Sequence, residues 1–279
     1  MSNYAFQLVN VFAETPFGGN PLAVFTDARG LNTETMQAIA QQMNLSETTF
    51  ITPSLDASAA VRILTPAYEM PFAGHPTLGS AAVLAQNTQH ETLTLSMPAG
   101  IFTVIRTNTH WVFSAQAAQH RSVPVTQRAA FADTLGLNTQ DILEARFINS
   151  GHEQLLIKIA HPEAVLAARP QLAGLLRYCK NEHGHAGVYL WSEQQGIATV
   201  RQFLVLNAGQ ILEDPGTGSA CANLGAWLAA DGVRNLQWRV EQGHILKRPN
   251  VLSLRIDAEG TVWVGGQVQF IGHGELTVP

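Results

Sequence analysis

The stretch that decides the fold reads Pro71-Phe72-Ala73-Gly74-His75-Pro76-Thr77-Leu78-Gly79. An extended apolar segment, Val61 to Pro66, leads into it, and a helical pattern, Thr77 to Ala85, follows it. Glycine permits a sharp turn and lets a ligand approach main-chain N–H groups. Because the first N–H groups of a helix have no intrahelical partner, they point at whatever occupies the turn, and Pro76 suits that first turn. The stretch is therefore typical of an anion-binding elbow beside an imidazole, or of a plain strand-to-helix turn with an exposed His75.

A second elbow has the same design. It reads Glu213-Asp214-Pro215-Gly216-Thr217-Gly218-Ser219-Ala220. It follows the apolar run Ile211-Leu212 and opens a small-residue helix, Ala220 to Ala230. The two elbows lie about half a chain apart, as expected of two similar halves. Each carries one polar group of a catalytic type, His75 in the first and Asp214 in the second. Two facing helix N-termini would suit a small carboxylate substrate.

Composition limits the class of protein. The chain has 279 residues, of which 46% are hydrophobic and 13% are charged, with a net charge of -5. That length suits one large domain or two smaller ones with a real core. The absence of a basic block argues against a nucleic-acid partner, and no apolar run reaches membrane-spanning length. No export signal precedes the first strand, and two cysteines make no disulfide framework, so we expect a cytoplasmic protein.

The remaining pattern predicts short strands with a few helices. A helix is expected to begin at Asn32 or Thr33 and to carry Met36, Ile39, Ala40 and Met43 on one face. A polar stretch, Gln116 to Val125, is interpreted as a linker between halves. Near the end, Gly265-Gly266 is expected to separate one strand, Thr261 to Val264, from a last one, Val268 to Ile271.

Glu47 lies where the first helix gives way to a strand, Thr48 to Ile51. Its apolar neighbours Leu45, Phe50 and Ile51 would penalise the charged carboxylate and raise its pKa towards neutrality. A pKa near 7 is what a general acid or base needs. The alternative is a surface glutamate in a loop, which is the commoner fate of a glutamate.

Several motifs together resemble one family. They are Gly19-Asn20-Pro21-Leu22-Ala23-Val24-Phe25, Asn44-Leu45-Ser46-Glu47-Thr48-Thr49-Phe50, Thr65-Pro66, the two elbows and the glycine-spaced ending Gly265 to Leu276. In this order, along the whole chain, they resemble the PhzF family of phenazine-biosynthesis isomerases. The likeness implies an α+β fold like that of diaminopimelate epimerase. In that fold each of two similar halves is a curved mixed sheet or barrel around a central helix. The expected halves are 1–117, with 265–279 returning to it, and 118–264.

The resemblance also implies a function. It predicts a homodimeric, cofactor-independent isomerase that moves a proton on a small unsaturated carboxylate or amino-acid-like substrate. The implied acid/base is Glu47, with His75 and Asp214 as further catalytic residues. The implied substrate-binding residues are Gly74, Gly218, Ser219, Asn20 and Thr217. For Asn20, ordinary turn chemistry is the alternative.

The sequence departs from the family pattern at Asn10-Val11-Phe12 and in the strand Arg201 to Val205, which lacks a proline. Both departures bear on substrate identity more than on chemistry. Epimerase relatives need a cysteine in each elbow. The first elbow here has none, and Cys221 falls inside the second helix, so a two-thiol mechanism is disfavoured. A metal at His183-Gly184-His185 is also disfavoured, because no further ligand is suitably spaced. A non-catalytic acid-binding protein and a cysteine-independent epimerase or racemase remain alternatives.

Overall fold

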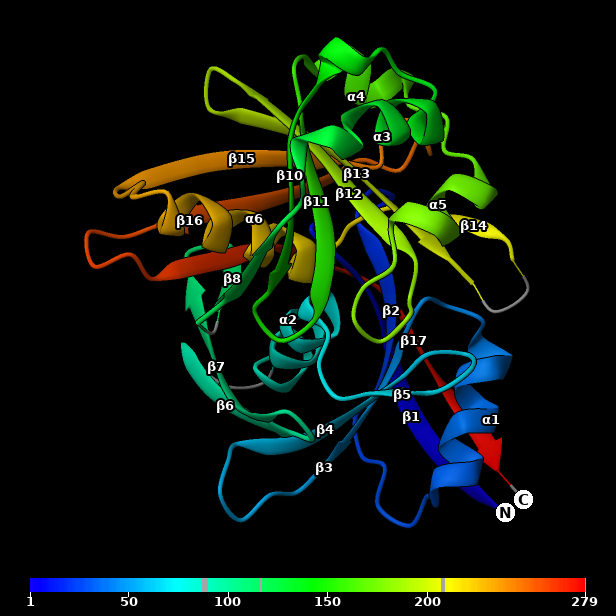
Figure 1. Cartoon of the computed structure of the whole chain (residues 1–279). Coiled ribbons are helices and arrows are strands. Elements are labelled where there is room, and N and C mark those ends of the chain that lie inside the picture. Colours follow the sequence, from blue (N-terminus) through cyan, green and yellow to red (C-terminus); the bar gives the residue numbers. More distant parts are fainter. Residues whose placement is uncertain (87–89, 116, 207–208, 279) are drawn as a thin grey trace. The chain divides into compact units, whose positions relative to one another are not determined.

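The computed structural model describes residues 1–86, 90–115, 117–206 and 209–278. The chain divides into two compact units: unit 1 comprises Met1–Ser114 and Gly265–Pro279, and unit 2 comprises Ala115–Val264. Figure 1 colours the elements along the sequence. Within the described ranges, no helix has the length and hydrophobicity needed to cross a bilayer.

Unit 1 is a closed ring of strands around one helix. Its strands are β1 (Ser2–Val11), β2 (Asn20–Phe25), β3 (Thr48–Thr52), β4 (Ala59–Leu64), β5 (Glu69–Met70), β6 (Thr92–Met97), β7 (Gly100–Thr107), β8 (His110–Ser114) and most of β17 (Val262–Val278). They pair in the order β17-β1-β2-β3-β4-β6-β7-β8, and the pairing of β8 with β17 closes the ring. The pairs β2–β3 and β4–β6 are parallel, so the sheet is mixed.

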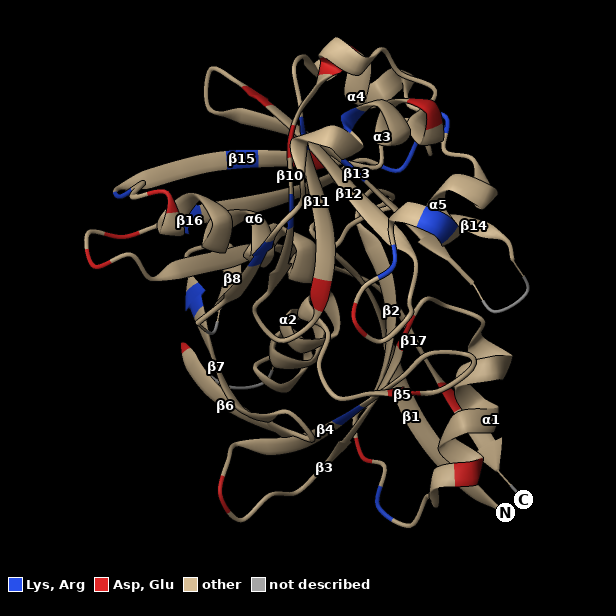
Figure 2. Ribbon diagram, viewed as in Figure 1, with Lys and Arg blue, Asp and Glu red and all other residues tan. Residues whose placement is uncertain are grey.

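The helix inside this ring is α2 (Gly74–Leu84), and every residue from Gly74 to Val83 is buried. It contacts β1, β2, β3, β4, β6, β7 and β8. A helix surrounded on all sides must be apolar or small all round. The sequence of α2 meets this need with glycine, alanine and serine and with no charged residue, and Figure 2 draws α2 tan throughout. The outer helix α1 (Thr33–Met43) begins after its N-cap Asn32 and buries Met36, Ile39 and Ala40 of the predicted face. Met43, the fourth residue of that face, is partly buried against the same cluster.

Unit 2 repeats the plan. Its strands are β9 (Gln119–Ser122), β10 (Ile142–Asn149), β11 (Glu153–Ile159), β12 (Gly187–Gln194), β13 (Ile197–Val205), β14 (Ile211–Asp214), β15 (Leu236–Gln242), β16 (Asn250–Ile256) and the first residues of β17. The pairs β11–β12 and β13–β15 are parallel, as are their counterparts in unit 1. The central helix α6 (Gly218–Ala230) packs against β10, β11 and β16 and is also free of charge. Smaller elements complete the unit: η1 (Val125–Gln127), α3 (Arg128–Leu135), η2 (Thr139–Asp141), α4 (Pro162–Ala167) and α5 (Leu172–Tyr178).

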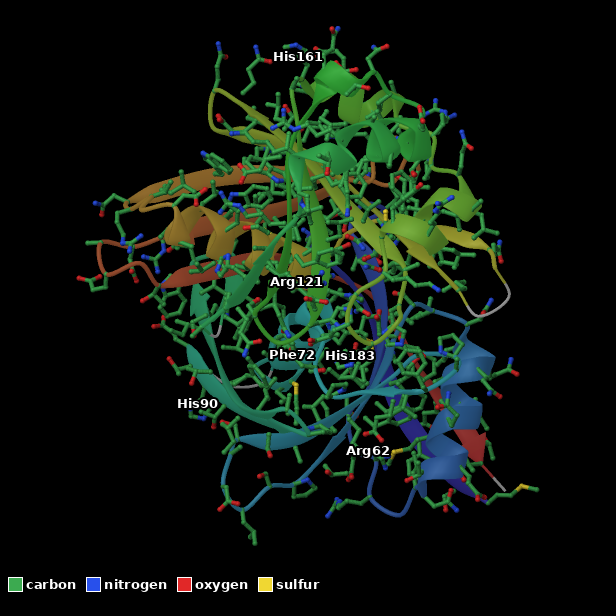
Figure 3. All side chains as sticks on the ribbon, viewed as in Figure 1. Arg62, Phe72, His90, Arg121, His161 and His183 are labelled. Atoms are coloured by element: carbon green, nitrogen blue, oxygen red, sulfur yellow. The ribbon has the colours of Figure 1, made fainter. Side chains whose placement is uncertain are left out.

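The repeat holds at the level of single residues. Strand β4 pairs with β5 at one end and with β6 at the other, and β13 does the same with β14 and β15. Ile63 lies opposite Met70, and Gln202 lies opposite Asp214, so Met70 and Asp214 hold matching places. One residue before each of these pairs, an arginine binds a glutamate through two hydrogen bonds: Arg62 binds Glu69 and Arg201 binds Glu213. Arg62, labelled in Figure 3, also donates to Thr33 of α1.

The α+β class with a central helix in each half is confirmed, but three local predictions were wrong. Gly265-Gly266 does not interrupt a strand, because β17 runs through it from Val262 to Val278. A Cβ atom at Gly265 would clash with the Trp111 carbonyl oxygen, so this glycine permits close approach to β8. The stretch read as a linker contains β9, which pairs with β10. Both elbow helices begin before the predicted starts, at Gly74 and Gly218.

Candidate active site

The elbow of unit 1 brings His75 to Glu47. His75 lies in the first turn of α2, and Glu47 directly precedes β3, so the fold joins two residues far apart in sequence. The Nε2 atom of His75 lies 3.5 Å from the Oε2 atom of Glu47, and the two side chains are 6% and 15% exposed. Both of these atoms are buried. The predicted apolar setting of Glu47 therefore comes with an imidazole as its neighbour.

The protonation state of His75 decides whether its contact with Glu47 is an ion pair. Burial lowers the pKa of His75 to about 3, although a hydrogen bond to the Pro21 backbone opposes the shift. Proline has no N–H, so the bond goes from the imidazole to the Pro21 carbonyl. Since Nε2 faces Glu47, Nδ1 is the donor to Pro21. A neutral imidazole that donates through Nδ1 presents a lone pair on Nε2, so at neutral pH the contact with Glu47 is not an ion pair.

Asn20 and Tyr68 also belong to the surroundings of Glu47. Asn20 opens β2, is buried and accepts a hydrogen bond from the Ser46 hydroxyl at 3.3 Å, next to Glu47 in the chain. Tyr68, in the turn between β4 and β5, has a pKa raised by burial and by the charge of Glu47. Sequence reasoning missed Tyr68, because no motif marks a tyrosine in a turn. The residues that unit 1 gathers are thus Glu47, His75, Asn20 and Gly74, with Tyr68 beside them.

The elbow of unit 2 holds Asp214. The Thr217 hydroxyl donates to Asp214 Oδ2 at 2.5 Å, and the Gly216 N–H reaches Asp214 Oδ1 at 3.5 Å. Ser219, in the first turn of α6, accepts from the Gln154 side chain at 3.3 Å. Gln154 was not predicted either, since its role depends on the fold of β11. The residues that unit 2 gathers are thus Asp214, Thr217, Gly218 and Ser219.

Both central helices begin without a side-chain cap. The N-cap residues are Ala73 in α2 and Thr217 in α6, and neither side chain bonds to its own helix. In the first turns, Gly74, His75, Gly218 and Ser219 carry backbone N–H groups of the kind that have no intrahelical partner. Such groups favour an anion at the helix N-terminus.

The described residues provide neither a reactive thiol nor a metal-binding cluster. Burial raises the pKa of Cys179 to about 12 and that of Cys221 further, so both thiols stay protonated. No group of three His, Cys, Asp or Glu side chains in the described ranges could hold a metal ion. His183, labelled in Figure 3, and His185 are exposed in a loop whose backbone is held by Asn181.

The comparisons with known proteins agree with the motifs. The family model described as phenazine biosynthesis-like protein, PhzC-PhzF, matches residues 9–274. The chain is 43% identical to an uncharacterized isomerase of Pasteurella multocida, covering 100% of this chain and 96% of that protein. It is 32% identical to a trans-2,3-dihydro-3-hydroxyanthranilate isomerase of Pseudomonas chlororaphis, covering 96% and 95%. A PhzF-family crystal structure from Bacillus anthracis shares the fold, with a TM-score of 0.86, 24% identity and full coverage of both chains. The chain belongs to the phenazine biosynthesis-like PhzC-PhzF family, and it is an isomerase.

Proposed function

We propose that this isomerase moves a proton on a small unsaturated carboxylate or amino-acid-like substrate, without a cofactor, and that Glu47 carries the proton. The buried contact between Glu47 and His75 is the observation that supports this role. A neutral His75 offers a lone pair that can stabilise the protonated carboxyl, while the ionised carboxylate can accept a proton from carbon. One side chain can therefore act first as base and then as acid.

In the proposed reaction a C–H bond next to the conjugated system breaks and its proton passes to the Glu47 carboxylate. The electron pair left behind enters the conjugated system. The same carboxyl then returns the proton to another carbon, which restores Glu47 and completes the isomerisation. Charge that develops on the substrate in between is stabilised by oriented N–H groups, usually a large electrostatic contribution to catalysis.

The substrate carboxylate is assigned to the first-turn N–H groups of Gly74 and Gly218, with help from the Ser219 hydroxyl. Asp214 is assigned to a polar group of the substrate, and Asn20 and Thr217 to positioning. The meeting of Glu47 and His75 with Asp214 on one substrate joins residues of different units, and it stays a prediction. A structure with a bound carboxylate ligand in which the Glu47 carboxylate lies away from that ligand would contradict the mechanism.

The test is Glu47→Gln, which keeps the shape but cannot accept the proton. Because a positioned acid or base contributes roughly 10² to 10⁴ in rate, uptake of deuterium from heavy water into the substrate should fall by about that factor. The first probe is trans-2,3-dihydro-3-hydroxyanthranilate, the compound in the name of the similar isomerase from Pseudomonas chlororaphis. An untargeted metabolite mixture is the second probe. Binding of a carboxylate ligand should persist, since the elbow N–H groups are unchanged.

The matched control is Glu91→Gln, an exposed glutamate of the same unit, which should exchange at the parent rate. A Glu47→Gln enzyme that also kept the parent rate would place the base elsewhere, and Asp214 would be tested next. Mass spectrometry and NMR of the product distinguish the alternatives. Deuterium at a new carbon indicates proton transfer between two carbons, and inversion at one carbon indicates an epimerase. A parent enzyme that bound the substrate without any exchange would contradict the proposed proton transfer.

A further inference from the structure

Gln242 is fully buried at the end of β15 and binds the elbow of unit 2 with both ends of its amide. Its Oε1 accepts from the Thr217 backbone N–H at 3.0 Å. Its Nε2 donates to the Asp214 carbonyl at 2.8 Å and to the Thr217 hydroxyl oxygen at 2.9 Å. One side chain thus fastens both ends of the turn that leads into α6.

These partners fix the orientation of the amide. A backbone N–H can only donate and a backbone carbonyl can only accept, so Oε1 must face Thr217 N and Nε2 must face Asp214 O. The Thr217 hydroxyl oxygen then accepts a hydrogen bond from Nε2, and its own hydrogen is directed to the Asp214 carboxylate. The result is a chain of hydrogen bonds with one direction, from Gln242 through Thr217 to Asp214.

We propose that Gln242 is a positioning residue that acts through Thr217 to hold the Asp214 carboxylate in its ionised, proton-accepting form. This inference rests on the proposed function, in which Asp214 binds a polar group of the substrate. A hydrogen bond donated to a carboxylate favours its charged form. Gln242 therefore acts indirectly: as a donor to the Thr217 hydroxyl oxygen, it turns the hydroxyl hydrogen away from itself and favours its direction towards Asp214.

The matching position of unit 1 indicates that the fold itself does not need this amide. Ala59 pairs with Leu95, and Ala198 pairs with Val240, so Met97 stands where Gln242 stands. There Met97 Sδ accepts from the Thr77 hydroxyl at 3.7 Å, and the turn itself is tied by backbone, from Ala99 N–H to the Pro71 carbonyl at 3.2 Å. In unit 2 the amide of Gln242 accompanies Asp214, whereas in unit 1 Met97 accompanies Met70.

Two titratable groups, on β12 and α6, lie near this elbow. Burial raises the pKa of Tyr189 on β12, with Cys221 and Asp214 adding to the shift, and burial raises that of Cys221 on α6. Both groups are thus neutral at pH 7. The guanidinium of Arg201 on β13 is bound to Glu213, the residue before Asp214, through two hydrogen bonds.

The experiment titrates the Asp214 carboxyl by ¹³C NMR in the full-length protein without substrate. Gln242→Met introduces the residue found at the matching place in unit 1, and Thr217→Val removes the hydroxyl at nearly constant volume. A hydrogen bond to a charged group contributes about 1.5–3 kcal/mol. Thr217→Val should therefore raise the Asp214 midpoint by about one to two pH units. Gln242→Met should raise it by less, because the Thr217 hydroxyl remains. Thr217→Ser should keep the parent midpoint, and so should Gln237→Met, an exposed glutamine on the same strand.

The double variant tests the order of the chain. If Gln242 acts through Thr217, Thr217→Val with Gln242→Met shifts the midpoint no further than Thr217→Val alone. Additive shifts would overturn the proposal, and so would an unchanged midpoint in Thr217→Val, which decides the matter even if Gln242→Met fails to fold. Failure of the proposed function looks different. Asp214→Asn would then retain full deuterium exchange, whatever the midpoints of the other variants.

Discussion

Replacing His75 by glutamine should make the free energy of unfolding less sensitive to pH in the acid range. His75 has a pKa of about 3 in the folded protein because burial penalises its charged form. In the unfolded chain its pKa is near 6.5. Below pH 6.5 the unfolded state therefore binds a proton that the folded state does not. The stabilisation is complete above about pH 6.5 and is lost as the pH falls towards 3, at about 1.4 kcal/mol per pH unit.

Between pH 7 and pH 5 this single group should cost the parent protein about 2 kcal/mol of unfolding free energy. The side chain is 6% exposed, so solvent screening takes little from that figure. Urea unfolding of the parent and of His75→Gln at both pH values gives the quantity directly, as the difference between the two pH-induced losses. Other titrating groups largely cancel in this comparison. The matched control is His90→Gln, an exposed histidine labelled in Figure 3.

The gap in unfolding free energy between parent and His75→Gln should narrow by about 2 kcal/mol on going from pH 7 to pH 5. If the two curves run parallel over this range, His75 is protonated alike in both states. The neutral imidazole, and with it the lone pair offered to Glu47, would then be refuted. A ring-nitrogen NMR titration showing His75 charged at pH 6 would lead to the same conclusion.

Three further outcomes can be measured. Glu213→Gln should lower the free energy of unfolding, measured with urea, by about 3–5 kcal/mol. The Arg201 and Glu213 side chains are 4% and 11% exposed, so the change leaves the Arg201 charge buried without its carboxylate partner. The matched change Glu69→Gln should lower the free energy of unfolding by about 1 kcal/mol or less, because the Arg62 and Glu69 side chains are each 30% exposed. Equal losses in the two variants would contradict the argument from burial. Cys221→Ala should keep proton exchange within about twofold of the parent, since burial keeps the thiol protonated, and inactivation by this change would revive thiol chemistry. Light scattering should report a homodimer, as the family resemblance implies, and a monomer at working concentrations would count against it.

The parts of the fold that could be predicted are those with local signals. The helix α1 followed from its apolar spacing and the cap at Asn32. The start of α2 could not be predicted in this way, because its N-cap residue is Ala73, which has no capping side chain. Gly265 was misread for a related reason: a glycine pair inside a strand looks like a break, and the contact with β8 that requires it lies far away in sequence.

The candidate site divides in the same way. Motif order nominated Glu47 and His75, and the structure gives them a shared buried contact. Nothing local marked Gln242, which looks like any polar residue closing a strand. Its partners Thr217 and Asp214 belong to the elbow before α6, which the end of β15 meets only in the folded chain, so only long-range register identifies it.

The shared strand β17 has a consequence for synthesis. Unit 2 is one continuous segment, Ala115–Val264, whereas the ring of unit 1 needs Gly265 and the residues after it between β1 and β8. During translation, where domains commonly fold in order from the N-terminus, strands β1 to β8 emerge first. They must nevertheless wait with two open edges until β17 has left the ribosome. The half made first is thus the half completed last, and during that interval its open edges are what a chaperone would have to shield.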